Sequence, residues 1–510
     1  MSEISQRTFP ELYPSRTKIV ATVGPASDSE EKLAAMIRAG VDIFRINMAH
    51  STPEQAQPVY DRIRKVSRDV HFPVAILADL AGPKMRLGAI PGDSYECADE
   101  SLIRFVRGET TTEPDSFTST YPPLIDELEI GNRVMLADGA VALQVIEKSA
   151  DVAICKIVQG GTIRSRQGIN LPGANLSVKT LQPRDIENAK WAVKVGVDFV
   201  GMSFVRRAAD VEELRRILLD NRPAGRKEAD IPHIISKIEK PEAVEQIREI
   251  ATASDGIMVA RGDLGVEVDI AQIAVIQKRI IRVCQRLCKP VIVATQMLES
   301  MHHQTLPTRA ETTDVANAIL DGADACMLSG ESAVGEYPVQ AVQMMHRIAV
   351  ETEKQLKRQL RRDIYDKIVT PVLQEIEATY GVEIDAFYKH IDVVTNAMCD
   401  AAVKLADDIN AAVLLVASET GKTTRNLSKK RHFTMTLGAS ENEFALRRMN
   451  LYWGVIPVAN LPTNPADRLS YVVEAGVREK YLKSGDYIVM INSIIPDSAT
   501  RNVLYVHKVT

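Results

Sequence analysis

The 510-residue chain has little cysteine, few aromatic residues and no long apolar run. Its 6 cysteines are scattered, so they cannot form the dense disulfide framework of small secreted domains. No stretch approaches the ~18 apolar residues of a membrane-spanning helix. The first residues also lack the apolar segment of a signal peptide. These absences predict a cytoplasmic protein that has no membrane partner.

An excess of charge of one sign is missing as well. The 62 Lys and Arg residues nearly balance the 67 Asp and Glu residues, and no basic run stands out. This balance argues against nucleic acid as the main partner. Hydrophobic residues make up 45% of the chain and charged residues 25%, which is typical of a folded globular protein. At roughly 100–200 residues per domain, the length allows about three domains.

Short apolar runs alternate with longer amphipathic segments, the pattern of β-strands followed by α-helices. The eight predicted strands are Lys18–Val23, Asp42–Asn47, Val74–Asp79, Asp198–Ser203, His233–Lys237, Gly256–Ala260, Pro290–Thr295 and Ala323–Leu328. The predicted helices are Glu30–Arg38, Pro53–Ser67, Asp185–Val195, Ala209–Asp220, Glu242–Thr252, Ile273–Leu287, Arg309–Asp321 and Val339–Gln355. This repetition predicts an α/β protein built on a (β/α)8 TIM barrel.

About a hundred residues separate the third strand from its helix, far more than a normal loop. Alternating strands are predicted there, at Arg133–Leu136, Val141–Glu147 and Val152–Val158. We expect residues 1–86 and 180–355 to form the barrel, and 87–179 to form an inserted all-β lid domain, a small β-barrel. Residues 356–510 are predicted to form a C-terminal α/β domain, with a helix at Ile391–Asp408 and strands at Ala412–Ala417, Thr434–Leu437, Gly454–Val458 and Tyr487–Ile491.

Polar residues follow the predicted strands, where a barrel places its active site. They are Arg45, Asn47, Asp79, Ser203, Lys237, Glu239, Arg261, Asp263, Thr295, Ser329 and Glu331. Glu239 and Asp263 follow adjacent strands, and such carboxylates suit Mg²⁺ or Mn²⁺. Lys237, Arg45 and Arg86 add cations to the same space. A hard metal among several cations favours phosphoryl transfer over hydride or acyl transfer.

Two further groups of residues bear on the site. Asn47 and His50 lie on the same loop as Arg45 and could bind a nucleotide phosphate. Gly262 beside Asp263 would let backbone N–H groups approach an anionic ligand at the start of a short helix. His302 and His303 lie on a polar loop, and we interpret them as surface residues and not as metal ligands.

Several long motifs are similar to those of the pyruvate kinase family. They are Thr22–Ser27, Asn170–Gly173, Ile235–Glu239, Ser254–Gly265, Lys289–Ser300, Pro307–Glu311, Asp314–Ala318 and Met327–Glu331. The resemblance runs from about residue 15 to 355 and, more loosely, through the C-terminal domain. It implies a cytoplasmic, allosteric homotetramer that acts in glycolysis. The implied reaction is phosphoryl transfer from phosphoenolpyruvate to ADP, which yields pyruvate and ATP.

The resemblance also assigns roles to individual positions. Glu239 and Asp263 resemble the divalent metal ligands, and Lys237 resembles the cation that stabilises the transferring phosphoryl group. Thr295 resembles the hydroxyl that helps protonate the enolate, and the final proton donor is left open. Backbone groups of Gly262 and Asp263 would bind the substrate carboxylate. The positions that resemble phosphate and ADP contacts are Arg45, Asn47, His50 and Arg86.

Three positions depart from the commonest family pattern. Many relatives have Ser at Ala49, Thr at Leu80 and Glu at Lys84, and the Ser and Thr help to hold a monovalent cation. Here two ion ligands are lost while a lysine is gained. We therefore expect Lys84 to substitute for the ion, so that K⁺ is not required.

The loop Ser418–Arg425 resembles the family's effector-phosphate loop. Its candidate ligands are Ser418, Thr420, Gly421, Lys422 and Thr423, and the alternative interpretation is a helix-capping loop. The segment Asn492–Arg501 has no glycine, whereas relatives have Gly-rich effector contacts there.

Two alternative functions are open. One is a metal-dependent barrel aldolase or lyase that acts on 2-oxo acids, which would need neither a lid, an ADP site nor Lys237. The other is a regulatory protein that senses metabolites with a disabled site. The filled catalytic positions argue against the second alternative.

Overall fold

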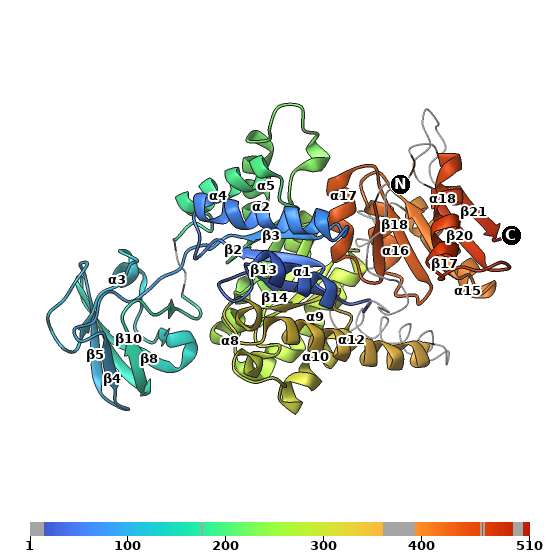
Figure 1. Ribbon diagram of the computed structural model, residues 1–510. Helices are drawn as coiled ribbons and strands as arrows, with labels where there is room; N and C mark the ends of the chain where they lie inside the picture. The colour runs from blue at the N-terminus through green and yellow to red at the C-terminus, as the bar shows by residue number, and fades with distance from the viewer. Residues whose placement is uncertain (1–14, 175–176, 361–392, 460–461, 463–464, 493–502) are drawn as a thin grey trace.

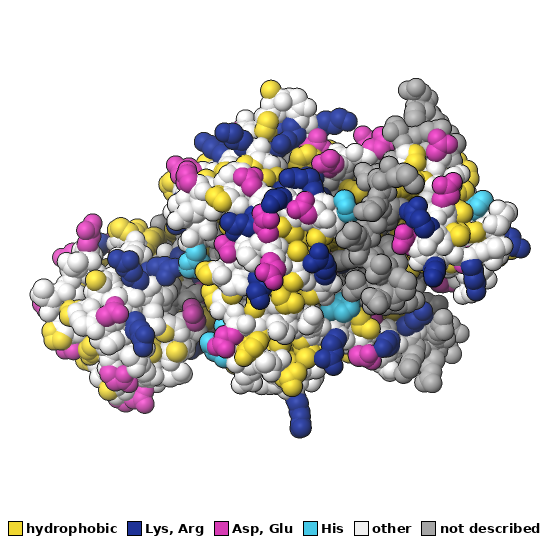
Figure 2. All heavy atoms as spheres, in the orientation of Figure 1, with side chains coloured by type: hydrophobic (Ala, Val, Ile, Leu, Met, Phe, Trp, Pro, Cys, Tyr) yellow, Lys and Arg dark blue, Asp and Glu magenta, His cyan; other side chains and the backbone are white. Residues whose placement is uncertain are grey.

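A computed structural model describes residues 15–174, 177–360, 393–459, 462, 465–492 and 503–510. The elongated molecule has a central barrel, with a β-rich insertion beyond one end and an α/β domain beyond the other (Figure 1). On the face drawn in Figure 2, basic and acidic side chains are interspersed. No described helix has the length and apolarity needed to cross a membrane.

Parallel strands close into the predicted barrel, in the order β1-β16-β15-β14-β13-β12-β3-β2. Their bounds are β1 Lys18–Thr22, β2 Ile43–Asn47, β3 Ala75–Asp79, β12 Phe199–Met202, β13 His233–Ile238, β14 Gly256–Ala260, β15 Val291–Ala294 and β16 Ala325–Leu328. Alternate residues such as Val20, Ile235 and Met258 form a core inside the barrel, while their neighbours pack outward against the helices. The fold predicted from the sequence is confirmed.

The helices around the barrel begin at recognisable capping residues. Ser29 accepts a hydrogen bond from Lys32 N–H, and Thr308 forms a capping box with Glu311. The helices are α1 Glu30–Ala39, α2 Pro53–Asp69, α4 Pro183–Val195, α5 Ala208–Asp220, α6 Pro241–Glu245, α7 Ile247–Ala253, α8 Arg261–Glu267, α9 Ile273–Arg286, α10 Arg309–Asp321, α11 Gly330–Ala333 and α12 Pro338–Leu360. The single helix predicted at Glu242–Thr252 is divided into α6 and α7 at Gln246.

The insertion between β3 and α4 folds around its own apolar core. A six-stranded sheet has the order β11-β7-β8-β9-β5-β6, and β10 pairs with β4 beside it. The elements are β4 Ser94–Cys97, β5 Leu102–Val106, β6 Ser116–Phe117, α3 Leu124–Glu127, β7 Arg133–Leu136, β8 Val141–Lys148, β9 Val152–Gln159, β10 Gly161–Arg164 and β11 Ile169–Asn170. The three predicted strands are present as β7, β8 and β9, and the short strands at the edges were not predicted.

The C-terminal domain is a five-stranded sheet with the order β19-β18-β17-β20-β21. Its described elements are α15 Val393–Asp408, β17 Val413–Ala417, α16 Lys422–Ser428, β18 Met435–Ala439, α17 Glu443–Arg448, β19 Val455–Val458, α18 Pro465–Arg478, β20 Tyr487–Asn492 and β21 Val503–Lys508. The four predicted strands are present as β17, β18, β19 and β20 and are parallel, and β21 is an additional antiparallel edge. The glycine-free segment after Asn492 lies outside the described residues, and the predicted domain boundaries remain predictions.

Four aspartates lie at the amino end of the barrel, of which Asp42, Asp198 and Asp324 are buried and Asp255 is partly exposed. Each one directly precedes a strand, and its Oδ2 accepts a backbone N–H from the neighbouring strand at 2.8–2.9 Å. The pairs are Asp42 with Ile19, Asp198 with Ile76, Asp255 with Ile234 and Asp324 with Val291. Each aspartate thereby links its own strand to one neighbouring strand, so the eight strands are joined in four pairs.

The C-terminal domain docks on this end through cations. Arg447 Nε lies 2.7 Å from Asp198 Oδ1, and Lys429 and Arg431 both pair with Asp324. Burial opposes ionisation of Asp198, but Arg447 and Arg64 hold its pKa below the usual value. The amino end of the barrel is therefore an electrostatically satisfied interface between domains.

Candidate active site

The polar residues predicted at the carboxyl ends of the strands lie together in the structure. Lys237 is at the end of β13, where Nζ lies 2.9 Å from Glu239 Oε1 and 3.5 Å from Asp79 Oδ2. It also donates a hydrogen bond of 2.8 Å to Ser203 Oγ. Burial disfavours its charged form, but Asp79 and Glu239 raise the pKa of Lys237 above its usual value. Lys237 is therefore a fixed ammonium at the centre of the site.

Asp79, at the end of β3, connects this lysine to Arg45 on β2. Arg45 Nη2 lies 2.6 Å from Asp79 Oδ2, and Arg45 Nη1 donates to Thr22 Oγ1 at 3.1 Å. Although burial opposes ionisation, Lys237 and Arg45 lower the pKa of Asp79. One buried carboxylate thus holds two cations beside each other, and this bridging position was not assigned from the sequence.

Glu239 is fully buried and accepts a 2.7 Å hydrogen bond from Phe204 N–H through Oε2. Burial raises its pKa; Lys237 opposes this shift, while the nearby Asp263 adds to it. Glu239 Oε1 is buried and contacts only Lys237 Nζ among the described side chains, and Asp79 Oδ1 is buried and accepts no hydrogen bond. Glu239 and Asp263 thus repel each other, and such a pair fits a divalent cation, because these ions prefer carboxylate ligands.

Thr295 and Gly262 meet beside these carboxylates. Gly262 N–H at the start of α8 donates to Thr295 Oγ1 at 2.7 Å, and this hydroxyl donates to Ala294 O at 2.6 Å. Thr295 and Gln296 have φ angles of 68° and 53°, in the left-handed region that non-glycine residues rarely adopt. Such strain is typical of functional sites.

A cavity of about 80 Å³, here called the small cavity, lies at the centre of this arrangement. Its polar lining comprises Arg45, Asn47, Asp79, Lys84, Ser203, Lys237, Asp263, Thr295 and Ser329. Seven different strand ends or the segments that follow them contribute to this lining. The barrel topology therefore brings together residues that are far apart in the sequence.

A cavity of about 400 Å³, here called the large cavity, lies between the barrel and the insertion. Its lining includes the predicted residues Lys84, Arg86 and Asp263. It also includes four residues that were not predicted: Arg166, Arg206, Lys240 and Asn170. Arg206 and Lys240 follow β12 and β13, so the signal that identified Glu239 could have found them. Arg166 follows an unpredicted strand and had no such signal.

The insertion contacts the barrel beside the large cavity. Glu267 at the end of α8 pairs with Lys240 Nζ at 2.7 Å and accepts from Asn170 Nδ2 at 3.2 Å. The Glu267 side chain is almost fully buried. This contact holds the insertion over the carboxyl end of the barrel.

The remaining predicted site residues lie outside the small cavity. His50 is exposed, and partial burial together with the nearby Lys84 and Arg86 charges lowers its pKa. In the C-terminal loop Ser418 and Thr423 are buried, whereas the side chains of Thr420 and Lys422 are exposed. Gly421 has a φ of 77° and directly precedes α16, so the loop leads into the amino end of a helix.

Cations arranged around two buried carboxylates, at the carboxyl end of a (β/α)8 barrel, are typical of enzymes that act on anionic substrates with a divalent metal. Comparison with known proteins identifies the family. A family model of the pyruvate kinase barrel domain matches residues 14–342, and one of the pyruvate kinase alpha/beta domain matches residues 396–507.

Individual relatives agree with these matches. The chain is 36% identical over 501 residues to a pyruvate kinase of Geobacillus stearothermophilus, covering 97% of this chain and 80% of that one. A pyruvate kinase of Staphylococcus saprophyticus is 36% identical over 499 residues, with the same coverage. The crystal structure of a Cryptosporidium parvum pyruvate kinase superposes with a TM-score of 0.85 at 31% identity, covering 100% of this chain and 98% of that one. The chain therefore belongs to the pyruvate kinase family, as its motifs predicted, and is an enzyme.

Proposed function

We propose that the protein transfers the phosphoryl group of phosphoenolpyruvate to ADP, giving pyruvate and ATP in glycolysis. The observation that supports this most is the fixed ammonium of Lys237 between Asp79 and Glu239, beside the small cavity. Negative charge spreads over the phosphoryl oxygens during transfer, and a preorganised cation at that place stabilises the transition state.

Glu239 and Asp263 would hold Mg²⁺ or Mn²⁺ against the substrate. When bound, this ion supplies positive charge to the substrate oxygens. Asp79 and Glu239 favour the charged form of Lys237, which raises its pKa. This supports an electrostatic role for the lysine.

Thr295 and Gly262 would act on the pyruvyl part of the substrate. The substrate carboxylate accepts the N–H of Gly262 and that of Asp263 in place of Thr295 Oγ1. The released hydroxyl then faces the enolate and helps to deliver the proton that forms the methyl group of pyruvate.

The large cavity is the proposed site for ADP. Arg45, Asn47, His50 and Arg86 were assigned to its phosphates from the family resemblance. Arg86 and Lys84 line this cavity, and Arg206 and Lys240 add two cations to it. Because Lys84 also lines the small cavity, the two cavities adjoin at that lysine.

An assay of the full chain with phosphoenolpyruvate, ADP and Mg²⁺, coupled to lactate dehydrogenase, tests this function. We expect NADH oxidation that requires both substrates. Pyruvate formation without ADP would show hydrolysis of phosphoenolpyruvate and would contradict the proposal. Zero turnover with both substrates at saturating Mg²⁺ would favour a lyase or a metabolite-sensing protein.

We further propose that K⁺ is not required, because Lys84 supplies the charge of the ion. No carboxylate among the described residues pairs with Lys84, although its side chain lines the small cavity with Asp79 and Arg45. Asp185 accepts the N–H groups of Ala81 and Gly82 at 3.1 and 3.2 Å, which fixes the loop that presents the lysine. A tethered ammonium can occupy the place of a monovalent cation.

Apolar side chains replace the expected oxygen ligands at this place. Leu80 is buried and Ala49 lines the small cavity, so neither offers a side-chain oxygen. We expect the wild type to have equal rates in K⁺ and tetramethylammonium salts at constant ionic strength. Severalfold activation by K⁺ would reject this proposal.

Family membership also supports three further proposals: a homotetramer, a cytoplasmic location, and allosteric control through the exposed part of loop 418–425.

A further inference from the structure

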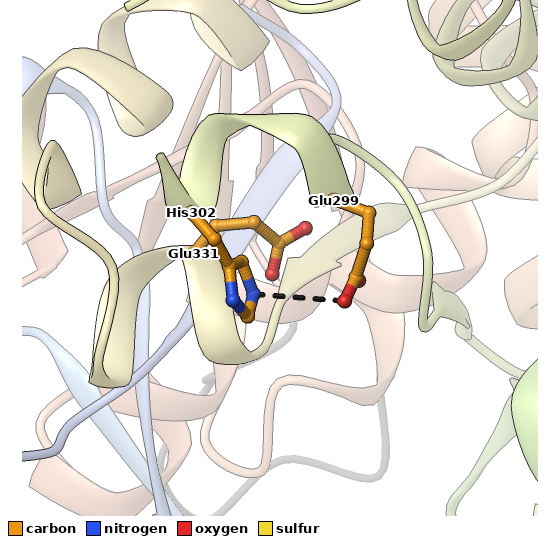
Figure 3. Close-up of side chains that lie close together, drawn as sticks. All are labelled: Glu299, His302 and Glu331. Atoms are coloured by element: carbon orange, nitrogen blue, oxygen red, sulfur yellow. Dashed lines mark ion pairs between the residues drawn. The ribbon is translucent and has the colours of Figure 1, made fainter. Parts of the chain in front are cut away.

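A second cluster of possible metal ligands lies outside the small cavity. Glu299 and His302 are on the short 3₁₀ segment η4 (Glu299–His302) after β15, and Glu331 is on α11 after β16. One ligand atom from each residue lies within 4.8 Å of the other two. Among the described residues, this is the only group of three or more His, Cys, Asp or Glu side chains with that spacing. The carboxylates and the imidazole face a common space (Figure 3).

Glu331 is a buried carboxylate that lacks a cation. Its Oε1 accepts Leu298 N–H at 3.1 Å and its Oε2 accepts Ser329 N–H at 2.7 Å. Each oxygen retains a further lone pair, because a carboxylate oxygen has two acceptor sites. No Lys or Arg among the described residues pairs with Glu331 or with Glu299. Burying such a charge is costly unless a cation or further donors compensate it.

His302 offers the matching nitrogen ligand. Its Nε2 is buried without a hydrogen-bond partner and lies 3.8 Å from Glu299 Oε1. The imidazole packs on Gly330, where an added Cβ would lie 2.3 Å from Nε2. The interpretation of His302 as a surface residue is therefore wrong with respect to Nε2, which is buried. His303 does lie at the surface, where Nδ1 is 3.0 Å from Glu336 Oε1.

We propose that Glu299, His302 and Glu331 form a site for a divalent transition metal of the Zn²⁺ type. Zn²⁺ accepts both imidazole nitrogen and carboxylate oxygen as ligands, whereas Mg²⁺ prefers oxygen ligands alone. The side chain of Glu299 is 55% exposed, so it can rotate to shorten the ligand distances. A bound ion would link the segment after β15, which contains Thr295, to the segment after β16.

Zn²⁺ titration of the EDTA-treated full chain, measured by calorimetry in excess Mg²⁺, tests the site. The Mg²⁺ keeps Zn²⁺ from the Glu239 and Asp263 pair. We expect the wild type to bind one Zn²⁺ ion. The variants His302→Ala and Glu299→Gln should each bind Zn²⁺ at least about tenfold more weakly. His303→Ala is the matched control and should bind Zn²⁺ like the wild type.

Thermal unfolding gives a second measurement, because a ligand that binds only the folded state raises the Tm. Zn²⁺ should raise the Tm of the wild type and of His303→Ala, but not that of His302→Ala. Equal Zn²⁺ binding by the wild type and His302→Ala, or loss of binding in His303→Ala, would overturn the proposal. Turnover in Mg²⁺ should be unchanged in His302→Ala, so this test is independent of the proposed reaction.

Discussion

Asp79 and Asp198 are buried carboxylates at opposite ends of the same barrel, and each contacts two cations. At the amino end, Asp198 uses both oxygens, since Oδ1 pairs with Arg447 and Oδ2 pairs with Arg64. At the carboxyl end, Asp79 Oδ2 faces both Arg45 and Lys237, while Oδ1 accepts no hydrogen bond. One end is saturated and joins two domains, whereas the other retains polar capacity for a ligand.

One lysine at each end shows a similar difference. Lys429 at the amino end is buried against Asp324. Lys84 at the carboxyl end is exposed and has no carboxylate partner among the described residues. Substitutions at the amino end should therefore affect mainly stability, and those at the carboxyl end should affect mainly the reaction.

Lys237→Met should give the largest effect on the reaction. Turnover should fall by several orders of magnitude, because the charge of Lys237 is needed where the phosphoryl group transfers. Steady-state kinetics would measure this loss, and circular dichroism would verify that the barrel remains folded. A variant that retains more than about a tenth of wild-type turnover would contradict the assigned role.

Glu239→Gln and Asp263→Asn should each raise the Mg²⁺ concentration for half-maximal rate by at least about tenfold. A neutral amide lacks the charge that a hard cation prefers. Mg²⁺ titrations of initial rate would measure the shift. If both curves overlay that of the wild type, these residues are not the metal ligands.

Asp198→Asn should lower the free energy of unfolding by about 3–5 kcal/mol, because it leaves Arg64 and Arg447 without their buried counter-charge. Asp28→Asn is a control, since it removes a largely exposed ion pair with Arg62 and should cost less than about 1 kcal/mol. Denaturant unfolding would measure both changes. A large loss of turnover in folded Asp198→Asn would remove the proposed distinction between the two ends.

His432→Gln should show the smallest effect, and only in acid. Burial, with a contribution from Arg16, lowers the pKa of His432 to about 3, whereas the unfolded chain titrates near 6.5. Below pH 6.5 the unfolded state binds a proton that the folded state does not, so stability falls as the pH decreases. Between pH 6.5 and 5.5 the wild type should lose about 1 kcal/mol more than His432→Gln. Parallel losses in the two proteins would show that His432 titrates normally.

Much of the fold was predictable because parallel barrel strands are short, buried and regularly spaced. The edge strands of the insertion could not be predicted, because β6 and β11 contain only two residues each. The aspartates before β2, β12, β14 and β16 are visible in the sequence. Two of them, Asp198 and Asp324, also pair with cations of the C-terminal domain, and those contacts depend on how the domain docks.

The central site residues were predictable for a related reason, because the carboxyl ends of the strands converge. Lys237, Glu239 and Thr295 were found in this way. The bridging by Asp79 was not predictable, since it depends on side-chain contacts with Arg45 on the neighbouring strand β2 and with Lys237 on β13. The burial of His302 Nε2 depends likewise on Gly330, which lies on another segment.

The most direct test of the account measures turnover of phosphoenolpyruvate and ADP by the wild type and Lys84→Glu, each in K⁺ and in tetramethylammonium at constant ionic strength. The account predicts that the wild type runs equally fast in both salts. Lys84→Glu should be slower in tetramethylammonium, because the built-in cation is lost. Severalfold activation of the wild type by K⁺, or full activity of Lys84→Glu without K⁺, would contradict it.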